Sequence, residues 1–341
     1  MKILRMPETT KLPEGAEIRR IDIMKTLDPV EDSLSRVREG LDRRIASLGS
    51  RVGDHLAEYV GRPGKMLRAR YALLLGRALG VEPKITEHVA RAIELVHNAS
   101  LLHDDCIDEG LTRRGIPTPN ARFGDRTGIL LGDLAFTEGM AEAVQIDADA
   151  VRSLARAVHE MTVGELQEEF LCGSLNVSIE GYYGVAARKT GALFGWGGEV
   201  LSKHSPESHT LGEPARLGTL AGILLQIVDD IHDFTLPEAV AGKAPGQDLH
   251  NGRLTLPGIL AMDDQESREA FTALWGVASK DNTAAHAEAM RIFKNGGHLD
   301  ASRTLASGLL NQMLPMVDRL PNEEVAAELR QFMELMFKRE F

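Results

Sequence analysis

Apolar residues recur every three or four positions along most of the chain after about residue 26, which is the spacing of one face of an α-helix. In 86–107, for example, Val89, Ile93 and Val96 fall on one side of a long helix. The same periodicity predicts further helices at 30–48, 65–79, 126–147, 150–171, 179–203, 207–235, 255–262, 266–278, 284–294, 298–318 and 322–338. The chain is therefore expected to be almost entirely helical.

The predicted helices follow one another without a linker that would separate two domains. Residues 1–25 mix proline, glycine and charged residues and are expected to be irregular. Strand-like alternation occurs only weakly, at 18–24. Because several helices are apolar on more than one face, we predict a single all-α domain, a packed helical bundle, over residues 26–341.

Composition and charge narrow the function. The 341 residues are 43% hydrophobic, which suffices for a large core, and the net charge of −11 argues against a nucleic-acid partner. No stretch reaches the roughly 18 apolar residues of a transmembrane helix, and the N-terminus shows no signal peptide. The two cysteines, Cys106 and Cys172, form no disulfide framework, so we expect a cytoplasmic protein.

The first candidate for chemistry is the segment LLHDDCIDEGLTRRG. Asp104 and Asp108 are four residues apart, so their carboxylates lie on one face of a helix, with Asp105 beside them. Oxygen-only clusters of this kind suit Mg²⁺, which is usually held by a few carboxylates and substrate phosphates. Taken alone, the segment could equally be a solvated acidic helix end that pairs with Arg113 and Arg114.

A second cluster of the same spacing favours the metal site. In LLQIVDDIHDF, Asp229, Asp230 and Asp233 repeat the pattern some 125 residues later, again after a run of apolar residues. Two such clusters facing each other across a bundle would form a site for several metal ions, whereas the alternative is two independent surface patches. A diphosphate would bind there only through divalent ions and nearby cations, because bare carboxylates repel it. The candidate cations are Lys65, Arg68, Arg113, Arg114, Lys189, Lys243 and Arg253.

Five ordered motifs resemble those of the trans-type polyprenyl diphosphate synthases. PGKMLRA is similar to the family's GGKRxRP segment, the two aspartate clusters to its two aspartate-rich motifs, and RKTGALF to its KT segment. GKAPGQDLHNGRLTLP is similar to the stretch after the second aspartate motif. The resemblance runs from about residue 60 to the C-terminus and implies a helical bundle around a central active-site cavity.

The family resemblance also implies an activity, a cofactor and a set of site residues. It implies a prenyltransferase that joins isopentenyl diphosphate to an allylic diphosphate. Three Mg²⁺ ions would be held by Asp104, Asp108 and Asp229. In or near the coordination shell of these ions would lie Asp105, Asp230 and Asp233. It implies allylic diphosphate contacts from Arg113, Lys189, Thr190, Gln226 and Lys243, and isopentenyl diphosphate contacts from Lys65, Arg68, His97 and Arg114. It also implies a homodimer.

Some positions differ from the family pattern. Pro63, Met66 and Ala69 replace a glycine, an arginine and a proline, although Lys65 and Arg68 remain. His232 stands between aspartates of the second cluster, Arg253 replaces a common lysine, and Glu168 lies near a family position that sometimes contacts metal.

Small residues below the first cluster predict a product longer than farnesyl diphosphate. Ala99 and Ser100 lie about one turn before Asp104, where short-chain members of the family carry a bulky aromatic residue. Phe136 is a candidate for a deeper floor of the cavity. Alternatively, the two small residues only allow close helix packing.

Two other functions fit parts of the pattern. A class I terpene cyclase ionises the same substrates, but its second metal motif is usually a mixed Asn/Ser/Glu pattern and not DDxxD. A regulatory subunit of a heteromeric synthase would usually lose aspartates, and this chain keeps both clusters.

Overall fold

The computed structural model describes residues 30–60, 64–113, 115–207, 212–235, 246–275 and 283–338. The expected irregular segment 1–25, including 18–24, lies outside the described residues. In chain order the described elements are α2 (Glu31–Ala46), α3 (Ser50–Val60), α4 (Leu67–Ala78), α5 (Pro83–Ile107), β1 (Thr112–Arg113), β2 (Ile116–Pro117), α6 (Pro119–Phe123), α7 (Asp125–Val144), α8 (Ala148–Leu171), α9 (Ile179–Ala186), the π-helical segment η1 (Ala187–Gly191), α10 (Ala192–Lys203), α11 (Glu213–Thr235), α13 (Gln247–His250), α14 (Leu256–Asp263), α15 (Gln265–Trp275), α16 (Thr283–Asn295), α17 (His298–Val317) and α18 (Glu323–Lys338).

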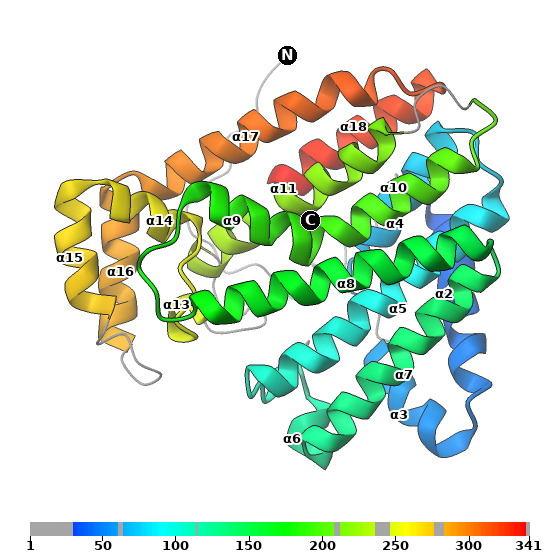
Figure 1. The fold of residues 1–341 in the computed structure, drawn as a ribbon, viewed down its shortest axis with the longest axis horizontal. Helices are drawn as coiled ribbons and strands as arrows, with labels where there is room; N and C mark the ends of the chain where they lie inside the picture. Colours follow the sequence, from blue (N-terminus) through cyan, green and yellow to red (C-terminus); the bar gives the residue numbers. More distant parts are fainter. Residues whose placement is uncertain are drawn as a thin grey trace, which may run out of the picture.

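The prediction of an all-α fold is confirmed (Figure 1). Most predicted helices begin and end within a few residues of their observed bounds. The pattern did not predict α3 or the antiparallel pair β1–β2, the only sheet in the described residues. No helix among the described residues has both the length and the apolar character needed to cross a lipid bilayer.

Two central helices, α5 and α11, carry the two aspartate clusters at their C-terminal ends. α5 packs against α2, α4, α7 and α10, and α11 packs against α10, α17 and η1. Ala92, Ile93 and Val96 of α5 are at most 1% exposed. In α11 the residues from Ala221 to Val228 are buried on nearly every side, with Gln226 as the one exception. Because neighbouring helices cover α5 and α11 on most sides, both helices carry long apolar runs before their aspartate clusters.

Side-chain caps fix where the helices beside the site begin. Asp147 accepts a hydrogen bond from the backbone N–H of Ala150 at 2.6 Å and starts α8. Ser178 accepts one from the N–H of Gly181 at 3.0 Å and starts α9. Such caps satisfy backbone donors that lack a partner within the helix.

The segment predicted as one helix at 179–203 contains a π-helical turn, Ala187–Gly191, between α9 and α10. π-Bulges are uncommon and often occur at functional sites. Here the turn is held by close backbone contacts: a Cβ atom on Gly222 would lie 2.6 Å from the Cα of Gly191, and one on Gly164 would lie 2.7 Å from the nitrogen of Lys189. Only glycine at these positions lets α8 approach Lys189 and α11 approach Gly191 so closely.

Candidate active site

Asp104 lies near the end of α5 and is surrounded by other charges. The pKa of Asp104 is raised to about 7, mainly by burial and next by the nearby carboxylate of Glu165. Lys189 and Arg113 act in the opposite direction. A carboxyl group held in a poorly hydrated place among other carboxylates favours a bound cation.

Asp108, one helical turn after Asp104, forms an ion pair with Arg253. The guanidinium of Arg253 donates to both carboxylate oxygens of Asp108, at 2.7 and 3.1 Å. Its Nε also lies 3.2 Å from Glu168 Oε2 on α8. Burial lowers the pKa of Arg253, but Glu168 and Asp108 more than offset this, so it stays charged. Arg253 therefore bridges the first aspartate cluster and α8.

Asp105 points to a different side of the helix from Asp104 and Asp108. It is 4% exposed, and Arg113 Nε lies 2.9 Å from each of its carboxylate oxygens. Asn120 also donates to the backbone carbonyl of Asp105 at 2.8 Å. In this structure Arg113, predicted to bind diphosphate, forms an ion pair with Asp105.

Lys189 lies between two glutamates of α8. Its ammonium group is 2.7 Å from Glu165 Oε2 and 2.6 Å from Glu168 Oε2. Burial lowers the pKa of Lys189, but the carboxylates of Glu168 and Glu165 raise it more, so the net shift is upward. The side chain therefore presents a fixed positive charge to the site.

The three aspartates of the second cluster have different surroundings. Asp230 and Asp233 are each 2% exposed, whereas Asp229 is partly exposed. Asp233 Oδ2 accepts a hydrogen bond at 3.0 Å from the backbone N–H of Asp248, at the start of α13. Asp230 accepts hydrogen bonds from Tyr182 and Gln226. Burial raises the pKa of Asp230 well above its usual value, nearby Asp248 adds to this, and the hydrogen bonds oppose it.

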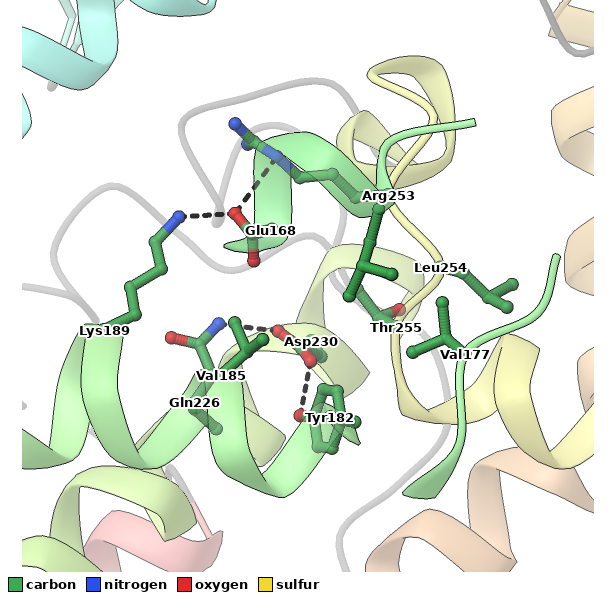
Figure 2. Close-up of a pocket in the computed structure, with 12 residues that line it drawn as sticks. Glu168, Val177, Tyr182, Val185, Lys189, Gln226, Asp230, Arg253, Leu254 and Thr255 are labelled. Atoms are coloured by element: carbon green, nitrogen blue, oxygen red, sulfur yellow. Dashed lines mark hydrogen bonds and ion pairs between the residues drawn. The ribbon is translucent and has the colours of Figure 1, made fainter. Parts of the chain in front are cut away.

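A pocket with a charged side and an apolar side lies between these groups (Figure 2). Figure 2 shows Glu168 between Lys189 and Arg253 on one side of the pocket, and Asp230 with its hydrogen-bond partners on the other. The apolar lining includes Leu171, Val177, Val185 and Leu254. Both aspartate clusters thus border one group of charges, formed by Glu168, Lys189 and Arg253.

The loop that carries Arg253 is tied to the end of α8. The N–H of Gly173 donates to the carbonyl of Gly252 at 2.8 Å, and the Cys172 thiol donates to the carbonyl of Asn251 at 2.8 Å. The indole N–H of Trp275 donates to the carbonyl of Gly173 at 3.0 Å. These contacts hold Arg253 opposite Asp108.

Of the residues predicted to bind isopentenyl diphosphate, Arg68 and His97 are in contact. Arg68 NH1 and His97 Nε2 lie 3.0 Å apart, and the Arg68 guanidinium also lies over the ring of Phe194 at 5.8 Å. Lys65 is exposed, and Met66 is buried with a left-handed φ of 47° immediately before α4. Arg114 and Lys243 lie outside the described residues.

The predicted chain-length residues have unequal exposure. Ala99 is fully buried, whereas Ser100 is partly exposed and its hydroxyl donates to the carbonyl of His97 at 2.8 Å. Phe136 lies against His103, with ring centroids 5.5 Å apart. Phe136 therefore packs beside the residue that immediately precedes Asp104.

The donor atoms fit a hard divalent cation. Asp104, Asp108 and Asp229 offer carboxylate oxygens, which suit Mg²⁺. Among the described residues, no three His, Cys, Asp or Glu side chains enclose a metal position by themselves. Mg²⁺ usually takes one or two carboxylates and completes its octahedron with water and substrate phosphates, so an open donor set agrees with metal held jointly with a diphosphate.

Sequence reasoning missed two residues of this site. Glu165 contacts Lys189, and Tyr182 donates to Asp230, but the sequence pattern predicted neither Glu165 nor Tyr182 as a site residue. The only local signal for Glu165 is its spacing of three from Glu168, which places both on one face of α8.

Comparisons with known proteins show which family and fold this chain resembles. The model of the polyprenyl synthetase family matches residues 50–293. The heptaprenyl diphosphate synthase component 2 of Geobacillus stearothermophilus is 30% identical over 315 residues, covering 92% of this chain and 97% of the relative. The nonaprenyl diphosphate synthase of Mycobacterium tuberculosis is 31% identical over 267 residues, covering 72% and 79%. The crystal structure of a decaprenyl diphosphate synthase from Rhodobacter capsulatus superposes with a TM-score of 0.81, 26% identity, and 93% and 98% coverage.

The chain therefore belongs to the polyprenyl synthetase family. The predictions of family, fold and enzyme class are confirmed: it is a prenyltransferase that condenses isopentenyl diphosphate with an allylic diphosphate. The terpene cyclase alternative is not supported.

Proposed function

We propose that this enzyme is a Mg²⁺-dependent synthase that extends an allylic diphosphate beyond the farnesyl length. The observation that carries this proposal is that both aspartate clusters border one group of partly buried charges, Glu168, Lys189 and Arg253. Arg253 contacts Asp108 and Glu168, and Glu168 contacts Lys189. Carboxylates for metal and cations for phosphate thus alternate around one site.

The residue roles follow from charge and position. Asp104, Asp108 and Asp229 would hold three Mg²⁺ ions, and Lys189 would stabilise the allylic diphosphate. Arg68 and His97 would hold isopentenyl diphosphate. The remaining substrate contacts that we propose are Lys65, Arg113, Arg114, Thr190, Gln226 and Lys243.

Bound Mg²⁺ supplies the positive charge that stabilises a departing diphosphate. The residues of this chain hold the two substrates next to each other and exclude water from the allylic cation that forms when the C–O bond breaks. The alkene of isopentenyl diphosphate then forms the new C–C bond, and the released diphosphate accepts the proton that is lost. No side chain of this site has to act as a strong base.

The test is an incubation of the purified chain with radiolabelled isopentenyl diphosphate, Mg²⁺ and geranyl, farnesyl or geranylgeranyl diphosphate in turn. We expect label in products longer than farnesyl diphosphate on reversed-phase chromatography, and none in excess EDTA. Asp104→Asn and Asp229→Asn should each lower turnover by roughly 10³-fold or more. Asp300→Asn, on an exposed turn of α17, is the matched control and should retain turnover.

Other outcomes would assign another function. Hydrocarbon formed from the allylic diphosphate alone would indicate a cyclase. Label incorporated only after a second protein is added would indicate one component of a heteromeric synthase. Full turnover in EDTA would contradict the metal requirement.

We also propose a cytoplasmic homodimer. Large apolar side chains are exposed on neighbouring helices, with Ile129 and Leu130 on α7 and Leu166 and Phe170 on α8. A second copy covering them would remove this surface from water. Sedimentation equilibrium should give twice the 37.2 kDa chain mass, and a monomer would contradict the proposal.

A further inference from the structure

Asp230 is fixed by hydrogen bonds to both of its carboxylate oxygens. The hydroxyl of Tyr182 donates to Oδ2 at 2.5 Å, and the amide nitrogen of Gln226 donates to Oδ1 at 2.8 Å. Asp230 is 2% exposed and Tyr182 is 7% exposed. Figure 2 shows the three side chains on the same side of the pocket. The two contacts together determine how the carboxylate is oriented.

The donors form a chain that ends at Asp230. The hydroxyl of Thr190 donates to Gln226 Oε1 at 2.7 Å, so the amide of Gln226 is oriented with its nitrogen toward Asp230. An ionised carboxylate only accepts hydrogen bonds, so the nitrogen of this amide faces Asp230 and its oxygen faces the Thr190 hydroxyl, which can donate. Thr190 and Gln226, both predicted to contact substrate, therefore also support the second aspartate cluster.

The tyrosine links two elements that carry different site residues. Tyr182 belongs to α9 and stands seven residues, or about two turns, before Lys189 in η1. Asp230 belongs to α11 and directly follows Asp229. Adjacent residues of a helix project about 100° apart, so fixing Asp230 also fixes the direction in which Asp229 points. The hydrogen bond therefore adds a link between the elements that carry Lys189 and Asp229, beside the close approach of Gly222 to Gly191.

We propose that Tyr182 is a positioning residue that anchors Asp230 and so directs Asp229 toward the metal and diphosphate site. Asp230 serves as the anchor and Asp229 as the metal-binding member of the pair. This inference rests on the proposed function for the role of Asp229. A buried tyrosine hydroxyl needs a partner in any case, and here that partner is a carboxylate of the aspartate motif.

The test compares Tyr182→Phe with Tyr183→Phe. Tyr183 is the matched control because it is the next residue, is only partly buried, and keeps its ring contact with residue 182 in both variants. Binding of Mn²⁺, a probe for Mg²⁺, is titrated calorimetrically in the presence of a non-reactive thio analogue of the allylic diphosphate. We expect about tenfold weaker binding for Tyr182→Phe, as is usual when a residue that supports a ligand is lost, and less than a twofold change for Tyr183→Phe.

Kinetics give a second readout. Tyr182→Phe should raise the Mg²⁺ concentration needed for half-maximal velocity, while the KM for isopentenyl diphosphate changes less than twofold. In an Asp230→Asn background, adding Tyr182→Phe should cost less than twofold, because the two residues act through one contact. Asp229→Asn should weaken metal binding far more than Asp230→Asn does.

The proposal is overturned if Tyr182→Phe binds metal as the parent does, or if Tyr183→Phe loses as much. Equal losses for Asp229→Asn and Asp230→Asn would overturn the division of roles and remain measurable if Tyr182→Phe does not fold. If the parent protein binds metal but incorporates no label, the proposed function fails, and the binding comparison still tests Tyr182.

Discussion

Individual side chains of the site are held by partners from other helices. Arg68 of α4 lies 3.0 Å from His97 of α5 and over the ring of Phe194 of α10. Lys189 contacts two glutamates of α8. The cations are thus positioned before substrate binds, which lowers the entropic cost of holding a phosphate.

Arg68→Ala should raise the KM for isopentenyl diphosphate about tenfold or more and leave the KM for the allylic diphosphate within twofold. One charge-assisted hydrogen bond contributes about 1.5–3 kcal/mol, which corresponds to a factor of ten or more. Steady-state kinetics with each substrate varied in turn provide the measurement. Arg77→Ala, further along α4 in an ion pair with Glu328, is the control and should change neither KM. Equal effects of Arg68→Ala on both substrates would contradict the assignment.

Only part of this residue-level arrangement was predictable from sequence. The aspartate spacing predicted both clusters because a carboxylate pair four residues apart is a local signal. The contacts of Tyr182 with Asp230 and of Glu165 with Lys189 join residues 48 and 24 positions apart in the sequence, and no local pattern reports them.

At the scale of elements, a buried ion cluster joins α2, α5 and α7 away from the active site. Glu142 of α7 is 3% exposed and accepts hydrogen bonds from Arg91 and His88 of α5, each at 2.8 Å. Arg44 of α2 contacts Glu142 and, at 2.8 Å, Glu138. The cluster ties α2, the first helix among the described residues, to α5, which bears the first aspartate motif.

Glu142→Gln should lower the free energy of unfolding by about 3 kcal/mol at pH 7, because it removes the close counter-charge of buried Arg91 and one of the two carboxylates that Arg44 contacts. Burial raises the pKa of Glu142, but Arg91, His88 and Arg44 lower it more, so the net shift is downward. The carboxylate therefore stabilises the fold above its unfolded-state pKa, and this contribution is lost as the pH falls through the lower folded-state value.

Urea denaturation from pH 7 down to the acid limit of folding tests this pH dependence. The difference between the parent and Glu142→Gln should shrink as the pH falls below about 4.3, the usual glutamate pKa. Glu160→Gln, which breaks the exposed contact with Arg188, is the control and should unfold like the parent. A difference that is constant over the whole range would show that the charge of Glu142 is not what stabilises the cluster.

Helix periodicity predicted the long elements because their apolar faces are continuous, but it missed two shorter ones. The helix α3 is short, yet its apolar residues Val52, Leu56 and Val60 recur every four positions, so the same periodicity could have predicted it. The π-helical turn in 179–203 has no signature of its own, because it depends on contacts with Gly164 and Gly222 from other helices.

At the scale of the whole molecule, the path of the growing chain decides the product. α7 lies so close to α5 that a Cβ atom on Gly132 would lie 2.2 Å from His103, and one on Gly139 would lie 2.8 Å from Val96. Ala99 stands between Val96 and His103 on that covered face and is fully buried. Ser100 projects about 100° away and is partly exposed. We therefore expect a prenyl tail that starts at Asp104 to pass Ser100 and not Ala99.

The two positions should respond differently to a bulky residue. Ser100→Phe should shorten the product by closing the path about one turn, ~5.4 Å, below Asp104, which is about the length of one isoprene unit. Ala99→Phe should mainly lower thermal stability, because α7 leaves no space for the ring.

Reversed-phase chromatography of the products and thermal unfolding of each variant separate these effects. Val144→Phe, at the exposed end of α7, controls for the added aromatic surface and should change neither property. Products of unchanged length from a folded Ser100→Phe would show that the tail does not pass this side of α5. Shorter products from a stable Ala99→Phe would instead place the tail between α5 and α7, which would require the two helices to separate.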